Sequence, residues 1–357
     1  MIQEKGPMDC PKVCIVILNW KRWKDTLECL ESLFKITYTN YEVLLIDNGS
    51  QNDSVSRIKE YCEGKRIPEF GPTIYNKANK PIQILEYSKE VAERGGNPKD
   101  EEMFNRMNPT FRLKLIALDK NLGYTGGNNV GMRYAMNSIG LEYILLLNDD
   151  TIVHPDFLTE LIRISRSDPK VGIVGPKVYY YDFKGRRDVI SSAGGNINLW
   201  MGRGEHRNLH RNDIDRGQYD SPSEVDFVEG SSILIKTEVF RKIGLLDEKL
   251  FAYWEETDFC FRAKKEGFGI MYAPKAMIWH KVDLDKRNEM RFYYVTRNRF
   301  WFMLEHATLA QSFTFMIYFF GYDLWKILSG VFRRKDMKSL AILFNAIIDG
   351  LFNPNWR

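Results

Sequence analysis

The sequence lacks the segments that mark a chain for secretion, disulfide bonding or nucleic-acid binding. Its five cysteines are odd in number and include no CxxC pair, so we expect free, buried thiols in a reducing compartment. The first twelve residues contain no apolar run of the kind that signal peptides carry, and we therefore expect a cytoplasmic catalytic part. No dense basic run precedes Arg333, Arg334 and Lys335, which argues against nucleic acid as a partner.

Two common nucleotide-binding signatures are missing as well. The sequence contains neither a Walker loop nor a GxGxxG fingerprint, so it does not predict an ATPase or a dinucleotide-dependent enzyme. Its composition is that of a folded protein, with 44% hydrophobic and 27% charged residues and a net charge of +4. This balance excludes a disordered chain, and the length of 357 residues predicts a large domain with an appendage.

Strand and helix patterns alternate through the first half of the chain. Continuous apolar runs rich in β-branched residues indicate buried strands, and apolar residues at helical spacing follow them. The alternation predicts an α/β fold with a doubly wound, mostly parallel sheet flanked by helices. The expected strands are 13–18, 41–46, 113–118, 143–147, 225–236 and 270–280, and the expected helices are 23–34, 53–62, 127–138, 237–243 and 255–266.

One stretch departs from this alternation. Residues 64–112 are rich in proline and charge and show a strand pattern only at 82–87, so we interpret them as a surface insertion. The apolar character of the chain changes again near its end. We therefore expect a catalytic domain over residues 1–290, which includes the insertion, and a C-terminal helical region over residues 291–357.

Acidic side chains stand where expected strands end. Asp149 and Asp150 follow one apolar run, and Asp47 closes another. Ligands of doubly wound sheets bind beyond the carboxyl ends of the strands, so these acids should lie in the ligand crevice. Paired carboxylates are hard oxygen ligands that suit Mg²⁺ or Mn²⁺, and a single one can bind a nucleobase or ribose. An ordinary turn rich in Asn and Asp is the alternative for both.

Three further features carry polar chemistry. The glycines of residues 123–127 precede an expected helix, where the backbone can approach a phosphate or sugar. Glu255, Glu256 and Asp258 crowd three carboxylates together, which raises their pKa values and suits a general base; an acidic first helical turn is the alternative. His280 ends an extended stretch and is well placed to complete a metal site, although a lone histidine is more often structural.

In their order and spacing these motifs resemble the inverting family-2 glycosyltransferases of the GT-A fold, especially the rhamnosyltransferase-like branch. The resemblance spans roughly residues 13–299. It implies a hexosyltransferase that moves a sugar from a UDP-, dTDP- or GDP-linked donor to a saccharide or lipid-linked acceptor, with inversion and with Mg²⁺ or Mn²⁺. The stretches that carry it are VCIVILNW, LLIDNGSQND, LDKNLGYTGGNN, ILLLNDDT, FVEGSSILIKTEVFRKIGLLDEKLFAYWEETDFCFRAKKEG, His280 and the later RNR.

The resemblance also implies a role for individual residues. Asp150 and His280 correspond to metal-binding positions, and Glu256 corresponds to the catalytic base. Asn148 replaces the first Asp of the family's D-x-D motif, and Glu256 replaces an Asp, so Asp258 and Glu255 remain alternative bases. Contacts with the nucleotide sugar, or in the case of the last residue with the diphosphate or acceptor, are implied for Asn19, Asp47, Gly126, Gly127, Asn128, Asp149 and Arg297.

Two other functions compete with this one. A sugar-nucleotide pyrophosphorylase shares the nucleotide-binding sheet but opens with a glycine- and arginine-rich loop after its first strand, and residues 19–24 contain no glycine. A non-catalytic sugar-binding scaffold has no need of Asp47, Asp150, Glu256 and His280 together. We therefore expect a transferase.

The C-terminal region combines apolar and basic segments. Residues 307–322 are apolar and aromatic, but they are fewer than the ~20 that a spanning helix needs. The basic cluster at 333–335 follows, and residues 340–352 are apolar again. Such a combination is typical of helices that lie on anionic lipid, so we expect peripheral contact with the inner face of the membrane. Packing on the catalytic domain or in an oligomer interface is the alternative.

Overall fold

The structure is a computed structural model that describes residues 10–67, 73, 75–206, 213–282, 289–334 and 336–352. The expectation about a signal peptide concerns residues that lie mostly outside this description, and Lys335 of the basic cluster lies outside it too. All five cysteines are free, as expected. Four of them are buried, and Cys10 is exposed.

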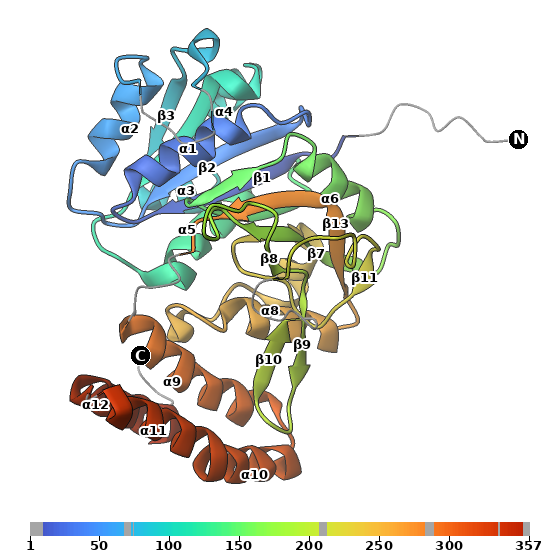
Figure 1. Cartoon of the computed structure of the whole chain (residues 1–357). Helices are drawn as coiled ribbons and strands as arrows, with labels where there is room; N and C mark the ends of the chain where they lie inside the picture. Colours follow the sequence, from blue (N-terminus) through green and yellow to red (C-terminus); the bar gives the residue numbers. More distant parts are fainter. Residues whose placement is uncertain are drawn as a thin grey trace, which may run out of the picture.

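A twisted, mostly parallel sheet forms the centre of the catalytic part (Figure 1). Across the sheet the strands are β11 (Ser223–Glu224), β13 (Gly269–His280), β7 (Val171–Tyr180), β12 (Ser232–Lys236), β5 (Tyr143–Asn148), β1 (Val13–Asn19), β2 (Tyr41–Asp47), β4 (Arg112–Ala117) and β3 (Gln83–Tyr87), while β6 (Thr151–Val153) pairs with β13 and β8 (Ile190–Ser192) with β7. β12 lies antiparallel between β5 and β7. β5, β1, β2, β4 and β3 are parallel, which confirms the predicted sheet.

Helices cover both faces of the sheet and create two hydrophobic cores. One face is covered by α1 (Trp23–Leu33), α2 (Ser54–Cys62) and α6 (Phe157–Ser165), and the other by α3 (Lys89–Glu93), α5 (Gly123–Asn137), α7 (Thr237–Ile243) and α8 (Glu255–Lys265). The sequence of β1 explains this arrangement. Val13, Ile15 and Ile17 point into the first core while Cys14 and Val16 point into the second, so both alternating sets must be apolar.

The insertion contributes to the sheet and is not a loop alone. The expected strand at 82–87 is present as β3, an edge strand paired with β4. Helix α4 (Pro98–Asn105) fastens the insertion to the domain, because Glu101 accepts a hydrogen bond of 2.6 Å from the buried ammonium group of Lys114. Lys114 also lies 3.1 Å from the buried Glu42 on β2. The short helices η1 (Lys77–Asn79) and η2 (Pro109–Phe111) complete the insertion.

Two predicted boundaries are wrong. The helix expected at 127–138 begins four residues earlier, at Gly123, so the glycine motif forms its first turns. The strand expected at 225–236 is confined to β12, because residues 225–231 cross to β12 from the short edge strand β11. A pattern of apolar residues cannot separate these segments, since Val225, Phe227 and Val228 are buried although they lie outside the strand.

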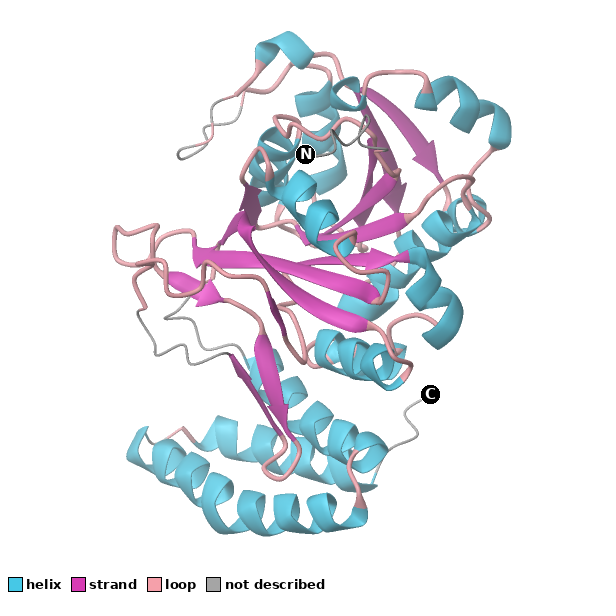
Figure 2. Ribbon diagram, turned by 90° about the vertical axis from the view of Figure 1, so that its right-hand side faces the viewer, coloured by secondary structure: helices cyan, strands magenta, loops and turns pink. Residues whose placement is uncertain are grey.

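The C-terminal helices form a separate layer below the sheet (Figures 1 and 2). They are α9 (Glu289–His306), α10 (Leu309–Tyr318), a π-helical turn (Phe319–Asp323), α11 (Leu324–Arg334) and α12 (Met337–Phe352). A hairpin of β9 (Gly195–Asn198) and β10 (Arg203–His206) reaches down to them from the sheet. Phe300, Phe315, Phe319 and Leu343 form a third core that Trp254 and Phe261 join from the catalytic part. One side of the layer therefore packs on the catalytic part.

Candidate active site

Several predicted site residues gather at the carboxyl edge of the sheet. Asn19 and Asp47 end β1 and β2 and are direct partners in the parallel register, and Asn148 ends the neighbouring β5. His280 ends β13 and pairs with Thr151 of β6, the residue after Asp150. The topology thus brings together residues that are far apart in the sequence, at the edge where such sheets bind ligands.

Asp47, the last residue of β2, is buried at this edge of the sheet in a hydrogen-bond network. The amide nitrogen of Asn19 and the hydroxyl of Ser50 each donate to Oδ1 of Asp47 at 2.5 Å. The backbone N–H of Ser50 donates to Oδ2 at 3.1 Å. All three residues are buried, so the network holds the carboxylate in one orientation. The Asp-Asn-Gly-Ser turn that seemed an alternative to a binding role is what builds this network.

Asp149 and Asp150 are both buried, but the charged groups around them differ. Burial and the neighbouring charge of Asp150 hold the pKa of Asp149 well above its usual value. Burial acts in the same direction on Asp150, but the charges of His280 and Arg22 and the hydrogen bond from Arg22 outweigh it, and its pKa falls to about 2. One nitrogen of the Arg22 guanidinium donates to Oδ2 of Asp150. Asp150 is therefore the ionised member of the pair.

His280 bridges two carboxylates. Its Nε2 lies 3.1 Å from Oδ1 of Asp150, and its Nδ1 lies 3.0 Å from Oε1 of Glu229. Burial lowers the pKa of the imidazole, but the two acids outweigh burial and raise it to about 10. The contact with Asp150 is an ion pair, and among the described residues no donor makes a hydrogen bond of good geometry to the buried Oδ1. Oδ1 of Asp150 is thus held by charge and not by a well-aligned hydrogen bond.

Glu229 is a site residue that the sequence analysis missed. It stands in the Val-Glu-Gly-Ser stretch before β12, where a single acid between apolar residues carries no recognisable spacing. The next residue, Gly230, lies beside Glu256. A Cβ atom added to Gly230 would be 3.8 Å from both Cβ and Cδ of Glu256. The Glu229 turn therefore connects the His280 cluster with the acids of α8.

The three acids at the start of α8 have different surroundings. Burial raises the pKa of Glu256 to about 7, and the charge of Glu229 adds to this rise, against the backbone N–H groups that favour ionisation. Burial and then the charge of Glu256 hold the pKa of Glu255 well above its usual value, and its buried Oε2 has no hydrogen-bond partner in the part of the chain that the structure describes. Asp258 is paired with Arg262 at 2.8 Å and with His306 at 2.6 Å.

The glycine motif serves close packing within the protein. A Cβ atom on Gly127 would meet a methyl group of Leu18 on β1 at 2.5 Å, so this glycine lets α5 lie directly on the sheet. A Cβ atom on Gly126 would meet the side chain of Leu122 at 2.9 Å. Asn128 is buried and donates to the carbonyl of Tyr124 within the same helix. The contacts of these residues are internal in this structure.

Arg297 and Trp254 also make internal contacts. Nη2 of Arg297 donates to the carbonyls of Lys249 and Leu250 at 2.8 and 3.0 Å, so the guanidinium is held against the loop before α8. The ring of Trp254 packs on Phe302 with centroids 5.1 Å apart. Trp254 therefore packs against the third core as a partly buried aromatic residue.

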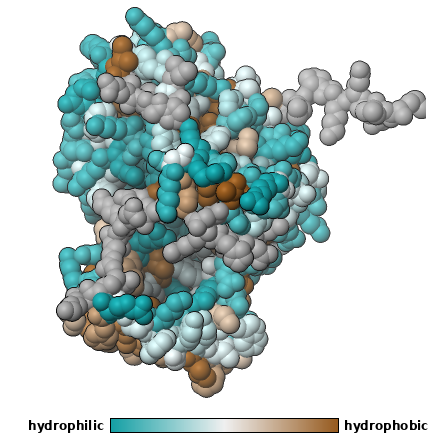
Figure 3. Space-filling view, viewed as in Figure 1, coloured by the Kyte–Doolittle hydropathy of each residue, from teal (hydrophilic) through white to brown (hydrophobic). Residues whose placement is uncertain are grey.

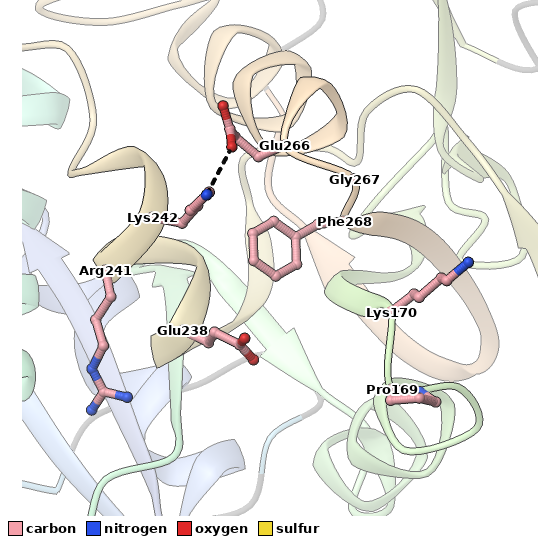
Figure 4. A pocket seen from close by; sticks show the side chains of 8 residues that line it. All are labelled: Pro169, Lys170, Glu238, Arg241, Lys242, Glu266, Gly267 and Phe268. Atoms are coloured by element: carbon pink, nitrogen blue, oxygen red, sulfur yellow. Dashed lines mark ion pairs between the residues drawn. The ribbon is translucent and has the colours of Figure 1, made fainter.

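A groove lies elsewhere on the catalytic part (Figure 4). It has a volume of about 510 Å³ and is lined by Pro169, Lys170, Glu238, Arg241, Lys242, Glu266, Gly267 and Phe268. These residues precede β7 and β13 or follow the antiparallel β12, so the groove lies at the amino edge of the sheet. Two of its lining residues form an ion pair, with the ammonium group of Lys242 3.4 Å from the Glu266 carboxylate. The position and paired charges separate it from the active site.

Comparison with known families identifies the chain. The profile described as "Glycosyltransferase like family 2" matches residues 97–303, and the profile "Glycosyl transferase family 2" matches residues 14–78. The chain belongs to glycosyltransferase family 2. The expected enzyme class, a nucleotide-sugar-dependent glycosyltransferase, is confirmed, and neither the pyrophosphorylase nor the scaffold alternative is favoured.

Three relatives of this glycosyltransferase are named as sugar transferases. It is 27% identical over 244 residues to the low-salt glycan biosynthesis hexosyltransferase Agl10 of Haloferax volcanii, over 66% of this chain and 75% of that protein. It is 24% identical to the dTDP-rhamnosyl transferase RfbF of Shigella flexneri, over 56% of this chain and 67% of that protein. It is 23% identical to an N-acetylglucosaminyl-diphospho-decaprenol L-rhamnosyltransferase of Mycobacterium tuberculosis, over 62% and 73% of the two chains.

Solved structures confirm the GT-A fold of this glycosyltransferase. The mannosyltransferase PcManGT of Pyrobaculum calidifontis, solved with GDP-Man and Mn²⁺, aligns with a TM-score of 0.54 at 13% identity, over 98% of this chain and 91% of that chain. TarS residues 1–349 of S. aureus, solved with UDP-GlcNAc, also gives 0.54 at 13% identity, over 95% and 80%. At these identities the similarity establishes the fold alone.

Proposed function

We propose that the enzyme transfers a sugar with inversion in one displacement at the carboxyl edge of the sheet, with Glu256 as the base. The acceptor oxygen forms a bond to the anomeric carbon while the bond from that carbon to the diphosphate oxygen breaks. The acceptor proton passes to the Glu256 carboxylate. The observation that carries this proposal is the pKa of about 7 of Glu256, in a partly buried position next to the Glu229–His280–Asp150 cluster.

The surroundings of the three acids favour Glu256 over the two alternative bases. Both carboxylate oxygens of Asp258 are engaged, with Arg262 and His306, and its lowered pKa makes it a weak proton acceptor. Glu255 is buried, and burial holds its pKa well above the usual value, which disfavours the carboxylate form that a base needs. Glu256 combines partial exposure with a pKa close to neutrality, as a general base requires.

We also propose that the donor lies along the same edge, with its nucleoside toward Asn19 and Asp47 and its diphosphate toward Asp149 and Asp150. The residues fit a divalent cation such as Mg²⁺ or Mn²⁺. Among the described residues no well-aligned hydrogen-bond donor reaches the buried Oδ1 of Asp150, and Nε2 of His280 lies 3.1 Å from this oxygen. No three His, Cys, Asp or Glu side chains form a complete metal cage within the described parts of the chain, so the donor diphosphate would supply further ligands. When bound, the ion supplies positive charge that stabilises the departing nucleoside diphosphate.

In the absence of a donor, Arg22 and His280 balance the charge of Asp150. Arg22 is half exposed and comes from the turn after β1, so it can release Asp150 and turn toward a phosphate. We include Arg22 among the donor-binding residues for this reason. The contacts of Arg297 are with the loop before α8, and we assign it no contact with the donor.

We propose a lipid-linked or membrane-presented acceptor. No helix among the described residues is long and apolar enough to cross a membrane. The C-terminal helices nevertheless expose a row of apolar side chains. Brown atoms lie among pale and teal ones along the lower margin of the molecule (Figure 3). Leu309, Phe313 and Ile317 follow one face of α10 at helical spacing and are 92%, 68% and 58% exposed, and Trp325 of α11 is 67% exposed. Contact with the acyl boundary of anionic lipid would cover this row.

The direct test is a screen of UDP-, dTDP- and GDP-sugars by thermal shift with and without Mn²⁺, since a donor that binds the native state raises the melting temperature. The donor that binds is then incubated with a lipid-linked saccharide. We expect release of nucleoside diphosphate and a product of inverted anomeric configuration. Release of pyrophosphate, or retention of configuration, would contradict the proposal.

A further inference from the structure

The loop that leads into the acids of α8 has an unfavourable backbone conformation. Between η3 (Glu248–Leu250) and α8, three residues other than glycine have positive φ: Phe251 at 63°, Tyr253 at 66° and Trp254 at 74°. The N–H of Ala252 donates to the carbonyl of Leu250 at 2.7 Å, which makes Phe251 the centre of a γ-turn of the rare positive-φ kind. Such a loop persists only where its surroundings fix it.

Asn298 of α9 supplies a large part of that constraint. Its side-chain nitrogen donates to the carbonyls of Leu250 and Ala252 at 2.9 Å each and to that of Tyr253 at 2.7 Å. Asn298 is fully buried. The two N–H groups of one amide thus serve three carbonyls of the strained loop, with one N–H shared between two of them.

Arg297 fixes the orientation of that amide. Its Nε donates to Oδ1 of Asn298 at 2.9 Å, so the amide nitrogen must point toward the loop. Nη2 of Arg297 donates to the carbonyls of Lys249 and Leu250. The guanidinium itself lies over the ring of Trp301, 4.1 Å from its centroid. Two successive residues of α9 thus bind the carbonyls of the loop together.

The other side of the loop is closed by the glycine motif. The N–H of Thr125 donates to the carbonyl of Phe251 at 3.1 Å. Gly123 has a φ of +75°, and a Cβ atom there would meet the ring and the carbonyl of Phe251 at 2.5 and 2.6 Å. The loop is therefore held between the start of α5 and the middle of α9.

We propose that Asn298, oriented by Arg297, is a positioning residue that sets the place of Glu256. The inference rests on the proposed role of Glu256 as the base. Glu256 stands only two residues after Trp254, in the first turn of α8. If the loop relaxed to negative φ, this turn would point in another direction and carry the Glu256 carboxylate with it. The same contacts tie the C-terminal helices to the acids, because α9 is the helix on which α12 packs and Tyr293 donates to Asp349 of α12 at 2.6 Å.

The test compares two isosteric substitutions in the full-length enzyme. Asn298→Asp keeps the shape but replaces an N–H donor by an oxygen that repels three carbonyls. Asn79→Asp is the matched control, because Asn79 is also a buried asparagine whose amide donates to a carbonyl, that of Thr110 in the insertion. We expect Asn298→Asp to lower kcat about 10- to 100-fold, as a displacement of about 1 Å does, with the donor KM within about twofold.

Two further readouts separate positioning from a general loss of stability. The acidic limb of the pH profile, near pH 7 in the wild type, should move in Asn298→Asp and stay in place in Asn79→Asp. Hydrogen exchange should accelerate at the amides of residues 251–258 and not in β1 and β2. This exchange readout needs no turnover, so a wild type that transfers no sugar would refute the proposed function and still leave the positioning testable.

Two further substitutions test whether the loop conformation causes the loss of kcat. Glycine adopts positive φ freely, so Tyr253→Gly added to Asn298→Asp should restore part of kcat. If Asn298→Asp does not fold, Arg297→Lys, which loses the Nε–H that orients the amide, takes its place with the same readouts. A folded variant with normal kcat and an unmoved acidic limb would overturn the proposal. Exchange that increased equally throughout the fold would overturn it as well.

Discussion

Nε2 of His306, in the last turn of α9, lies 2.6 Å from Oδ1 of Asp258 in the first turn of α8. Oδ2 of the same carboxylate accepts a hydrogen bond of 2.8 Å from Nε of Arg262. Burial raises the pKa of Asp258, but these two partners outweigh burial and lower it. Asp258, two residues after Glu256, thus joins α9 of the C-terminal region to α8 of the catalytic part. We therefore expect substitutions of Glu256 and Asp258 to have different effects.

Glu256→Gln should retain donor binding and lower kcat by roughly two to four orders of magnitude, because the amide cannot accept the acceptor proton. Initial rates and donor-induced thermal shifts measure the two properties. Glu266→Gln, at the other end of the α8 region and paired with Lys242 on the surface, is the control and should keep normal turnover. A large loss in Asp258→Asn together with none in Glu256→Gln would move the base by two residues.

Asp258→Asn should act mainly on stability, and its effect should depend on pH. The folded pKa of Asp258 lies below its unfolded value, so its stabilisation is fully present above about pH 4 and is lost as pH falls through the folded pKa. At pH 7 we expect a free-energy loss of about 3 kcal/mol, as when one member of a buried pair is removed. Urea unfolding of wild type and variant at several pH values measures the difference. A difference that stayed constant down to the acid limit would contradict the assignment.

Activity should rise with pH through neutrality. The base acts as a carboxylate, and the pKa of Glu256 is raised to about 7, so kcat/KM should fall about tenfold per unit below that pH and level off above it. Rates between about pH 5.5 and 8.5 define this limb, and kcat/KM reports the free enzyme. The limb should be absent from the residual activity of Glu256→Gln. A flat profile through pH 7 in the wild type would exclude Glu256 with this pKa.

Asp150→Ala should abolish transfer and the metal-dependent binding of nucleoside diphosphate. The substitution removes the ionised carboxylate, while His280 keeps its contact with Glu229. Calorimetric titration of UDP, dTDP and GDP with and without Mn²⁺ measures binding, and circular dichroism checks the fold. Asp53→Ala, which removes an exposed acid paired with Arg57, is the control. Full wild-type activity in excess EDTA would count against a metal in the reaction.

Phe313→Glu and Trp325→Glu, each in the full-length protein, should weaken flotation with anionic liposomes at low salt. Both side chains belong to the exposed apolar row of the C-terminal helices. A carboxylate in their place would lose its hydration on entering the acyl boundary of the lipid, which is unfavourable. Ile139→Glu is the control, because Ile139 is 92% exposed at the end of α5 and should not affect flotation. If the wild type itself stays at the bottom of the gradient, the lipid contact is wrong. Deleting the helices is a poorer test, since Leu343 and Ile347 are buried with Phe300 of α9.

The order of strands and helices in the catalytic part followed from the sequence for a clear reason. β1, β2 and β5 lie in the middle of the sheet, and both of their faces are buried, so their apolar runs are continuous and their bounds match the prediction closely. The start of α5 was misplaced because glycine usually ends or precedes a helix. Here Gly123 and Gly126 lie in its first turns, where an added Cβ atom would meet Phe251 at 2.5 Å and Leu122 at 2.9 Å, so packing requires glycine at this end of the helix.

The sequence by itself determined the family, the parallel sheet and the acids at its carboxyl edge, because strand ends and motif spacing are local properties of the chain. Only the tertiary structure decided what each polar group does. Glu229 contacts His280 across 51 residues of sequence, His306 contacts Asp258 across 48, and Asn298 holds a loop that precedes it by 45 to 48. A carboxylate's pKa and an amide's partners depend on which charges and carbonyls lie within a few ångströms, and folding brings these groups together across distances that no local pattern records.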